Sequence, residues 1–153
     1  MISIKTFKPE FAAAFKALNV AWIEQFFEME AGDYKALDHP QDYILDKGGE
    51  IFVAISGSVV IGVCAMIKVN DTEYELAKMA VSEQARGKGT GLQLGKAAIA
   101  WAREKGARRV VLDSNKKLEA AIQLYYKLGF KALDMLHSPY QRSDIQMVLD
   151  LPH

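Results

Sequence analysis

The sequence predicts a mixed α/β fold built on one central sheet. Two observations support this prediction: segments with the strand period of two alternate with segments of helical period, and glycine or proline stands at several boundaries between them. The length agrees, because 153 residues are typical of one domain, which we expect over residues 1–153. The expected order is βααβββαβαββ around a single hydrophobic core.

The first third of the chain predicts one strand and two helices. Residues 2–7 alternate well enough for a strand, and Pro9 suits the first turn of the following helix. The apolar residues of that helix recur at steps of three and four: Phe11, Phe15, Leu18, Trp22, Phe26 and Met29. A proline also opens a second, short helix over residues 40–46, and Gly48 and Gly49 end it.

Three strands follow, and then the period changes. Residues 51–56 and 59–69 are β-branched and apolar, and Gly57-Ser58 between them suits a type II′ hairpin. A turn at Asn70-Asp71 leads into a third strand, residues 73–81. The remaining elements are a helix, a strand, a helix and two strands, over residues 89–105, 109–113, 118–128, 130–133 and 144–151.

Composition and charge narrow the range of functions that the chain can have. The chain is 50% hydrophobic and 25% charged, as in an ordinary globular protein, and its formal net charge is zero. Because a broad positive charge is missing, we do not expect nucleic acid as the primary partner. No stretch approaches the roughly 18 uninterrupted apolar residues of a membrane span, and no signal sequence opens the chain. We therefore expect a cytoplasmic protein without a membrane partner.

Charged residues are unevenly distributed along the chain, and the single cysteine lies among apolar residues. Acids outnumber bases over residues 24–50, and bases outnumber acids over residues 86–117. Both stretches are compatible with solvated helix faces; the functional alternative is a cation-tolerant pocket in the first and an anion site in the second. Cys64 lies in an apolar run and is expected in the core.

Residues 84–91, Gln-Ala-Arg-Gly-Lys-Gly-Thr-Gly, join a predicted strand to a predicted helix. Glycines let the backbone come close to a ligand, and several N–H groups can converge on one anion at the positive end of the helix dipole. Arg86 and Lys88 add charge that suits a diphosphate. The spacing fits neither G-x-G-x-x-G nor a P-loop, since Ala97 follows Gly95-Lys96 where the P-loop has serine or threonine.

The loop fits the pattern Q/R-x-x-G-x-G/A, with Gln84, Gly87 and Gly89 at the fixed positions. Residues 115–130 hold a second motif, which ends in Gln-Leu-Tyr-Tyr-Lys-Leu-Gly-Phe. On these two motifs the chain resembles the GNAT superfamily of acetyl-CoA-dependent N-acetyltransferases over nearly its whole length. Residues 140–147 are similar to a bacterial branch that includes acetyltransferase domains fused to MarR-type regulators.

The resemblance implies an acyl-CoA N-acyltransferase fold with acetyl-CoA as cofactor and acetyl donor. It implies cofactor contacts from Met79, Ala80, Val81, Arg86, Gly87, Lys88, Gly89, Thr90, Gly91 and Asn115. The first three would line the pantetheine arm, with an N–H at or near Ala80 polarising the thioester, and the loop N–H groups would bind the pyrophosphate. Asn115 would contact the pantetheine from the far side. The strands over residues 73–81 and 109–113 would splay to admit the cofactor.

The resemblance also implies catalytic candidates. Acetyl transfer to an amine needs a base, donors for the oxyanion and a proton for the CoA thiolate. Tyr125 holds the general-acid position of the family, with Tyr126 as the alternative, and core packing is the structural alternative for both. Glu75 stands where some members place a glutamate that removes the amine proton, although a solvent-facing strand carboxylate is equally compatible. Lys78 is expected on the opposite face of the strand from Glu75, without a catalytic role.

The acceptor is expected to be the primary amine of a small molecule, such as an amino acid, a polyamine or an amino sugar. Its pocket should involve the first helices and the loop over residues 140–142; the candidate wall residues are Trp22, Glu24, Phe26 and Tyr34. For Arg142, pairing with a surface aspartate is favoured over binding a substrate carboxylate. No metal is expected, because His39, His137 and His153 lack partners at metal-ligand spacing.

Two other functions stay open at this level. One is a non-catalytic module that binds or senses acetyl-CoA, and the other is an acetyltransferase for protein lysines or N-termini. The sequence does not define the oligomeric state, and a homodimer is compatible with it.

Overall fold

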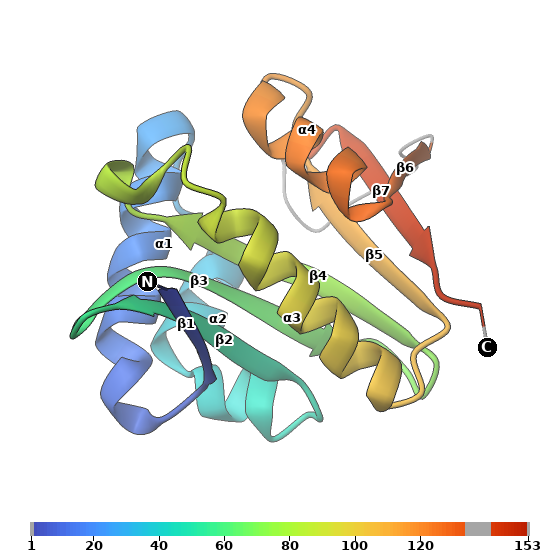
Figure 1. The fold of residues 1–153 in the computed structure, drawn as a ribbon, viewed down its shortest axis with the longest axis horizontal. Coiled ribbons are helices and arrows are strands. Elements are labelled where there is room, and N and C mark those ends of the chain that lie inside the picture. The colour runs from blue at the N-terminus through green and yellow to red at the C-terminus, as the bar shows by residue number, and fades with distance from the viewer. Residues whose placement is uncertain (1, 134–141, 153) are drawn as a thin grey trace.

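The structure is a computed structural model that describes residues 2–133 and 142–152. Its elements follow the predicted order βααβββαβαββ (Figure 1), which confirms the mixed α/β class. The helices are α1 (Ala12–Phe26), α2 (Ala31–Asp38), α3 (Thr90–Glu104) and α4 (Glu119–Leu128). The strands are β1 (Ile2–Thr6), β2 (Glu50–Ser56), β3 (Val59–Lys68), β4 (Glu73–Val81), β5 (Arg109–Ser114), β6 (Lys131–Leu133) and β7 (Ile145–Asp150).

All strands belong to one seven-stranded sheet in the order β1-β2-β3-β4-β5-β7-β6. Neighbouring strands are antiparallel except for β4 and β5, which run parallel. This parallel pairing is short and ends where Glu75 pairs with Val111. Beyond that point β4 and β5 diverge, so the second half of β4 has no strand partner on its β5 side among the described residues.

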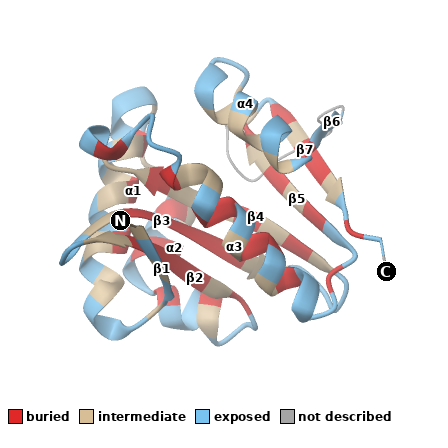
Figure 2. Ribbon diagram, in the orientation of Figure 1, coloured by how far each residue is buried: buried red, intermediate tan, exposed pale blue. Residues whose placement is uncertain are grey.

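Helices cover both faces of the sheet. In the view of Figure 1, α3 and α4 lie in front of the sheet and α1 and α2 lie behind it. Alternate residues of β3 show the two cores: Cys64 and Met66 pack under α3, whereas Val63 and Ala65 pack against α1 and α2. Both cores are therefore built on the strands of the sheet, where many of the buried residues in Figure 2 lie.

The second helix lies earlier than predicted. Residues Ala31–Asp38 form α2, whereas Gln41–Leu45, where the helix was expected, form a short π-helix. A capping box begins α2: the Glu30 side chain accepts the Asp33 N–H, and Asp33 accepts the Glu30 N–H at 2.9 Å. The first helix ends at Phe26, because Phe27 is extended, so Met29 lies beyond the helix whose stripe it was expected to join.

A bulge in β4 resets the alternation of its side chains. Val63 pairs with Ala80 and Ala65 pairs with Ala77, so two residues of β4, Lys78 and Met79, oppose one residue of β3. Lys78 has a φ of 53°, in the left-handed region that side chains other than glycine rarely adopt. The prediction that Lys78 and Glu75 lie on opposite faces is therefore wrong, because the extra residue turns Lys78 to the face of Glu75.

Candidate active site

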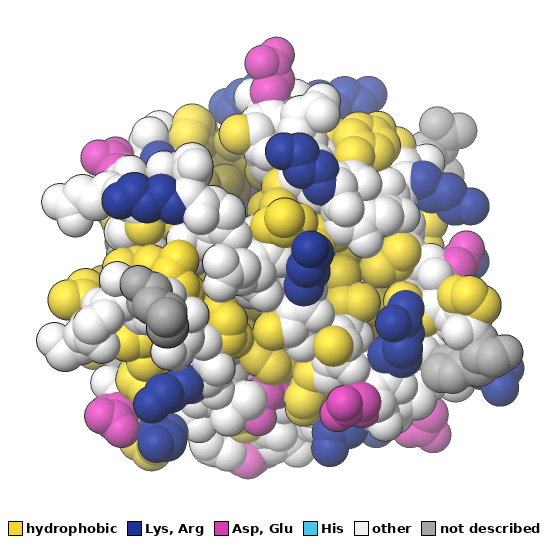
Figure 3. Space-filling model, in the orientation of Figure 1, with side chains coloured by type: hydrophobic (Ala, Val, Ile, Leu, Met, Phe, Trp, Pro, Cys, Tyr) yellow, Lys and Arg dark blue, Asp and Glu magenta, His cyan; other side chains and the backbone are white. Residues whose placement is uncertain are grey.

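A groove runs between the end of β4, the start of α3 and one side of α4. It encloses about 410 Å³ and we call it the outer groove. Its walls are Trp22, Met79, Ala80, Val81, Ala85, Arg86, Gly87, Gly89, Thr90, Gly91, Leu92, Ala120, Ala121, Gln123, Leu124, Tyr125 and Lys127. Figure 3 shows the face that carries α3 and α4, where lysine and arginine side chains are spread among apolar ones.

The start of α3 presents hydrogen-bond donors to this groove. The backbone N–H groups of residues 87–92 donate to no other described residue, and Gln93 is the first to bond back, to the Gly89 carbonyl at 3.0 Å. The Thr90 hydroxyl is buried and also has no partner among the described residues. Unpaired donors at the positive end of a helix form a binding site for an anion.

The charged side chains of the loop do not all face the groove. Arg86 donates through Nε to the Val81 carbonyl and through Nη1 to Gln25, both at 3.2 Å. Lys88 lies beside a different hollow, near β1 and β3. Lys127 of α4 lines the groove instead, and sequence reasoning missed it. Its position three and four residues after Leu124 and Gln123 on the same helix could have indicated it.

A smaller cavity of about 90 Å³, here called the inner pocket, lies where β4 and β5 diverge. Its walls are Asn19, Trp22, Ile23, Phe27, Glu75, Leu76, Ala77, Lys78, Met79, Asp113, Ser114, Asn115, Leu118, Tyr125, Arg142 and Ser143. Tyr125, Trp22 and Met79 line both cavities. The outer groove and the inner pocket therefore meet at these three side chains.

Glu75 is placed in the inner pocket with a carboxyl group that titrates near neutral pH. Burial and the nearby charge of Asp113 raise its pKa to about 7, while the ammonium group of Lys78 opposes this rise. A carboxylate with this pKa is half ionised near pH 7 and can accept a proton from an amine.

Tyr125 stands at the junction of the two cavities. Burial, with a smaller contribution from Cys64, raises its pKa to about 12, so the phenol is fully protonated at neutral pH. Its ring packs edge-on against Phe130, with centroids 6.2 Å apart. Tyr126 is 47% exposed and lines neither cavity, so of the two neighbouring tyrosines only Tyr125 faces the candidate site.

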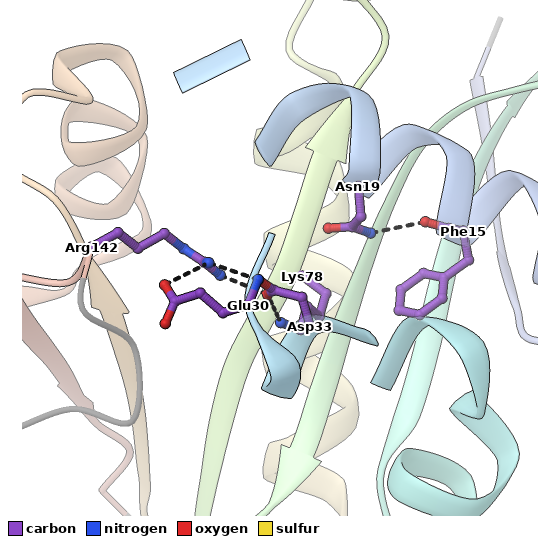
Figure 4. A network of polar contacts seen from close by, with 6 residues as sticks. All are labelled: Phe15, Asn19, Glu30, Asp33, Lys78 and Arg142. Atoms are coloured by element: carbon purple, nitrogen blue, oxygen red, sulfur yellow. Dashed lines mark hydrogen bonds and ion pairs between the residues drawn. The ribbon is translucent and has the colours of Figure 1, made fainter. Parts of the chain in front are cut away.

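A buried ionic network lies beside the inner pocket (Figure 4), and two of its members, Lys78 and Arg142, line the pocket. Asp33, fully buried, accepts hydrogen bonds from Arg142 Nη1 and Nη2 at 2.8 and 2.7 Å and from Lys78 Nζ at 2.8 Å. Arg142 Nη1 also lies 3.2 Å from a carboxylate oxygen of Glu30. Burial by itself raises the pKa of Asp33, but the bonds from Arg142, Lys78 and the Glu30 N–H outweigh it and lower the pKa to about 2.

Comparison with known proteins identifies the family of the chain. Residues 15–130 match the family described as Acetyltransferase (GNAT) family. The chain belongs to this family. It is 31% identical to N-acetyltransferase 8 of Rattus norvegicus over 99 residues, which cover 61% of this chain and 45% of that protein. It is 27% identical to the uncharacterized N-acetyltransferase YobR of Bacillus subtilis over 124 residues, 79% of this chain and 49% of that protein. The chain thus spans about half the length of these curated relatives.

Solved structures of GNAT proteins share the fold. An acetyltransferase of the GNAT family from Staphylococcus aureus superposes with a TM-score of 0.90 at 17% identity, over 99% of this chain and all of the other (100%). A Bacillus subtilis acetyltransferase in complex with CoA superposes with a TM-score of 0.75 at 22% identity, over 99% of this chain and 100% of that one. A Salmonella typhimurium protein with acetyl-CoA superposes with a TM-score of 0.76 at 20% identity, over 100% of this chain and 95% of that one. At these identities the similarity establishes the fold.

The structure brings together most of the residues that the GNAT resemblance implies. The predicted cofactor residues of β4, the loop and α3 line the outer groove, apart from Lys88. Asn115 lines the inner pocket, where its amide donates to the Arg142 carbonyl at 2.5 Å and its side-chain oxygen accepts the Lys117 N–H at 2.9 Å. Glu75 and Tyr125 line the same pocket.

The acceptor side was predicted less well. Trp22 lines the inner pocket as expected, but Phe27 lines it in place of Phe26, and Glu24 and Tyr34 line neither cavity. Arg142 pairs with an aspartate, as favoured, but this aspartate is the buried Asp33, which sequence reasoning missed. The only sequence signal for Asp33 is the spacing Glu30-x-x-Asp33 of a capping box. Tyr140, also expected at the pocket, lies outside the described residues.

Two further observations concern the described residues only. No group of three or more histidine, cysteine, aspartate or glutamate side chains among them is placed to hold a metal ion, and His137 and His153 lie outside this set. None of the helices described is long and apolar enough to cross a membrane.

Proposed function

We propose that the chain is an N-acetyltransferase that moves the acetyl group of acetyl-CoA to the primary amine of a small molecule by direct attack. One observation carries the proposal: Glu75 and Tyr125 line a single pocket, and this pocket meets, at Tyr125, a groove at the start of α3. The N–H groups of residues 87–92 there have no acceptor within the described part of the chain. Membership in the GNAT family and the names of the relatives support the same activity.

The outer groove fits acetyl-CoA. The N–H groups of residues 87–92 and the buried Thr90 hydroxyl, which has no partner among the residues described, would bind the pyrophosphate. Beyond Glu75 no strand of the described residues pairs with the β5 side of β4, so backbone groups of residues 79–81 would bond the pantetheine arm as a strand does, with Asn115 at its inner end. When bound, acetyl-CoA supplies a thioester whose carbon–sulfur bond breaks as the amine nitrogen bonds to the acetyl carbon.

Glu75 and Tyr125 divide the proton transfers. The Glu75 carboxylate accepts the proton that the amine nitrogen loses, and its pKa of about 7 keeps a useful fraction ionised at neutral pH. Tyr125 acts as general acid toward the sulfur of the leaving thiolate. Because a phenol with a pKa of about 12 is a weak acid, its hydrogen bond to the developing negative charge comes first and full proton transfer comes late.

The size of the inner pocket supports a small acceptor. A cavity of about 90 Å³ holds an amino group and a few carbon atoms. Trp22 and Phe27 supply apolar walls beside the two carboxylates Glu75 and Asp113. Assaying lysine-containing peptides beside free amines separates this proposal from a protein acetyltransferase, because the proposal expects the free amines to be the better substrates.

The test is thiol release from acetyl-CoA against a panel of amines, with two tyrosine variants. Tyr125→Phe should lower kcat by roughly 10²-fold or more and leave the Kd of acetyl-CoA within about threefold. Tyr126→Phe is the matched control and should stay within about twofold. Binding of acetyl-CoA without transfer to any amine would instead support a sensing module, and unchanged turnover in Tyr125→Phe would remove the acid role.

A further inference from the structure

Two carboxylates on neighbouring strands face the inner pocket. Glu75 pairs in register with Val111, and Asp113, two residues further along β5, lies on the same face of the sheet. Both side chains line the pocket, and the charge of Asp113 acts on Glu75. The local field at this end of the pocket therefore favours a positively charged ligand.

The basic side chains of the pocket are engaged with other carboxylates. Lys78 and both terminal nitrogens of Arg142 bind Asp33, and Arg142 also contacts Glu30 (Figure 4). The four charges of this network cancel, so the network brings no net positive charge to the pocket. A carboxylate on the acceptor would compete with the buried Asp33 for Nη1 and Nη2 of Arg142, which disfavours an amino acid as acceptor.

A cation site lies at the edge of the same pocket, and a lysine of the chain fills it. Lys117 Nζ is 4.2 Å from the centroid of the Phe27 ring and 3.4 Å from the Phe26 carbonyl oxygen, at the end of α1. Aromatic faces and the last carbonyls of a helix both attract cations. Phe27 also lines the inner pocket, so the cation site and the pocket share this side chain. Lys117 is exposed, and such a contact is weak enough for a ligand to displace.

We propose that the acceptor is a small aliphatic amine with a second ammonium group, that is, a diamine or polyamine. This inference rests on the proposed function, because it names the acceptor of the same pocket. The reacting nitrogen lies at Glu75, which accepts a proton as the new carbon–nitrogen bond forms and the carbon–sulfur bond breaks. The second ammonium keeps its protons and replaces Lys117 Nζ against the Phe27 ring and the Phe26 carbonyl.

The first test compares three ligands with the same five-carbon chain: pentylamine, 1,5-diaminopentane and 5-aminopentanoate. Calorimetric binding to the whole chain in the presence of CoA should give the diamine a Kd about tenfold or more below that of pentylamine, with 5-aminopentanoate weakest. Equal or tighter binding of either competitor, or no binding of the diamine, would overturn the inference. The expected order of binding without any acetyl transfer would keep the inference and contradict the proposed function.

The second test locates the distal ammonium. Phe27→Leu should weaken the diamine about fivefold and change the Kd of pentylamine by less than about twofold, because only the diamine uses the ring face. Lys117→Ala should tighten diamine binding by removing the competing ammonium. Lys116→Ala, at the adjacent exposed lysine, is the matched control. If Lys117→Ala and Lys116→Ala have the same effect, or Phe27→Leu weakens both ligands equally, the placement of the second ammonium is wrong.

Discussion

Glu75 carries its carboxyl group in a place where ionisation is disfavoured. Its pKa is about 7 in the folded chain and about 4.5 as an ordinary glutamate. As the pH rises from 4.5 to 7, the unfolded chain loses this proton before the folded chain does, so folding loses stability across that window. Above pH 7 the shifted pKa of Glu75 lowers the free energy of unfolding by on the order of 3 kcal/mol, and below pH 4.5 it has no effect. The proposed base is thus present at the expense of stability.

Replacing Glu75 should make this cost measurable. Glu75→Gln is expected to raise the free energy of unfolding by about 1–3 kcal/mol at pH 8 and by much less at pH 4, since glutamine does not ionise. Urea denaturation at the two pH values measures the difference, and Glu73→Gln, at the first position of β4, is the control. A gain that is the same at both pH values would show that the ionisation of Glu75 is not its cause.

Asp33 shows the opposite dependence. Its pKa of about 2 lies below the ordinary value of 3.8, so its contribution to stability is fully present above about pH 4 and is lost as the pH falls through 2. Asp33→Asn leaves the buried ends of Lys78 and Arg142 without their carboxylate, which should cost about 3 kcal/mol at pH 7. The loss should shrink as the pH approaches 2, because the wild-type carboxyl group then becomes neutral as well.

The control for Asp33 lies in the same helix. Asp38 forms an ion pair with Lys16 at the surface, so Asp38→Asn should cost no more than about 1 kcal/mol. Urea unfolding of both variants between pH 2 and pH 7 makes the comparison. Similar losses for Asp33→Asn and Asp38→Asn would mean that the buried network contributes no more than a surface pair.

At the scale of elements, α3 and α4 pack closely through two glycines. A Cβ on Gly91 would lie 3.0 Å from Leu124 Cδ2, and one on Gly95 would lie 2.5 Å from Leu128 Cδ1. Of the two, only Gly91 borders the outer groove. Both methyl groups would therefore push α4 away from α3, but only the first would enter the proposed cofactor site.

This difference gives a matched pair of variants. Gly91→Ala should weaken CoA binding about tenfold or more, because the methyl group stands beside the N–H groups that bind the pyrophosphate. Gly95→Ala should destabilise the fold by about 1–2 kcal/mol and leave the Kd within about threefold. Calorimetric titration with CoA and urea denaturation separate the two effects. Equal weakening of CoA binding in both variants would contradict the placement of the pyrophosphate.

Elements with a strong local pattern were predictable, and elements set by tertiary contacts were not. The β2–β3 hairpin follows from Gly57, whose φ of +63° suits glycine, and α4 ends at Gly129 with a φ of +102°. By contrast, α2 spans only eight residues with a weak apolar stripe, and it is fixed by tertiary contacts: the network around Asp33 and the burial of Ala36 and Leu37. The bulge at Lys78 has no sequence mark, because it arises from the register between β3 and β4.

At the scale of the whole molecule, the candidate site lies between two parts of the sheet. One part ends at β4 and the other begins at β5, and the two strands pair over only a short parallel stretch. Two contacts also cross the opening: Arg142 reaches Asp33 of α2, and Lys117 reaches the end of α1. The inner pocket is therefore a product of topology, assembled from segments far apart in the chain.

This origin explains which site residues the sequence could predict. The loop over residues 84–91 and Tyr125 lie in contiguous motifs, so a resemblance was enough to propose them. Asp33 and Phe27 enter the site only because α1 and α2 fold against β4, and Lys127 enters because α4 turns that side toward α3. Local spacing can place such residues on a helix face or at a helix start, but it does not show which distant segment they will meet.

The central claim is that the outer groove holds acetyl-CoA along β4 and at the start of α3. Hydrogen exchange of backbone amides, measured with and without acetyl-CoA, tests it most directly, because the N–H groups of residues 87–92 have no acceptor among the described residues. Acetyl-CoA should slow exchange at residues 87–92 and 79–81 and leave the turn at residues 69–72 unchanged. Binding without protection at residues 87–92, or no binding at millimolar acetyl-CoA, would contradict the claim.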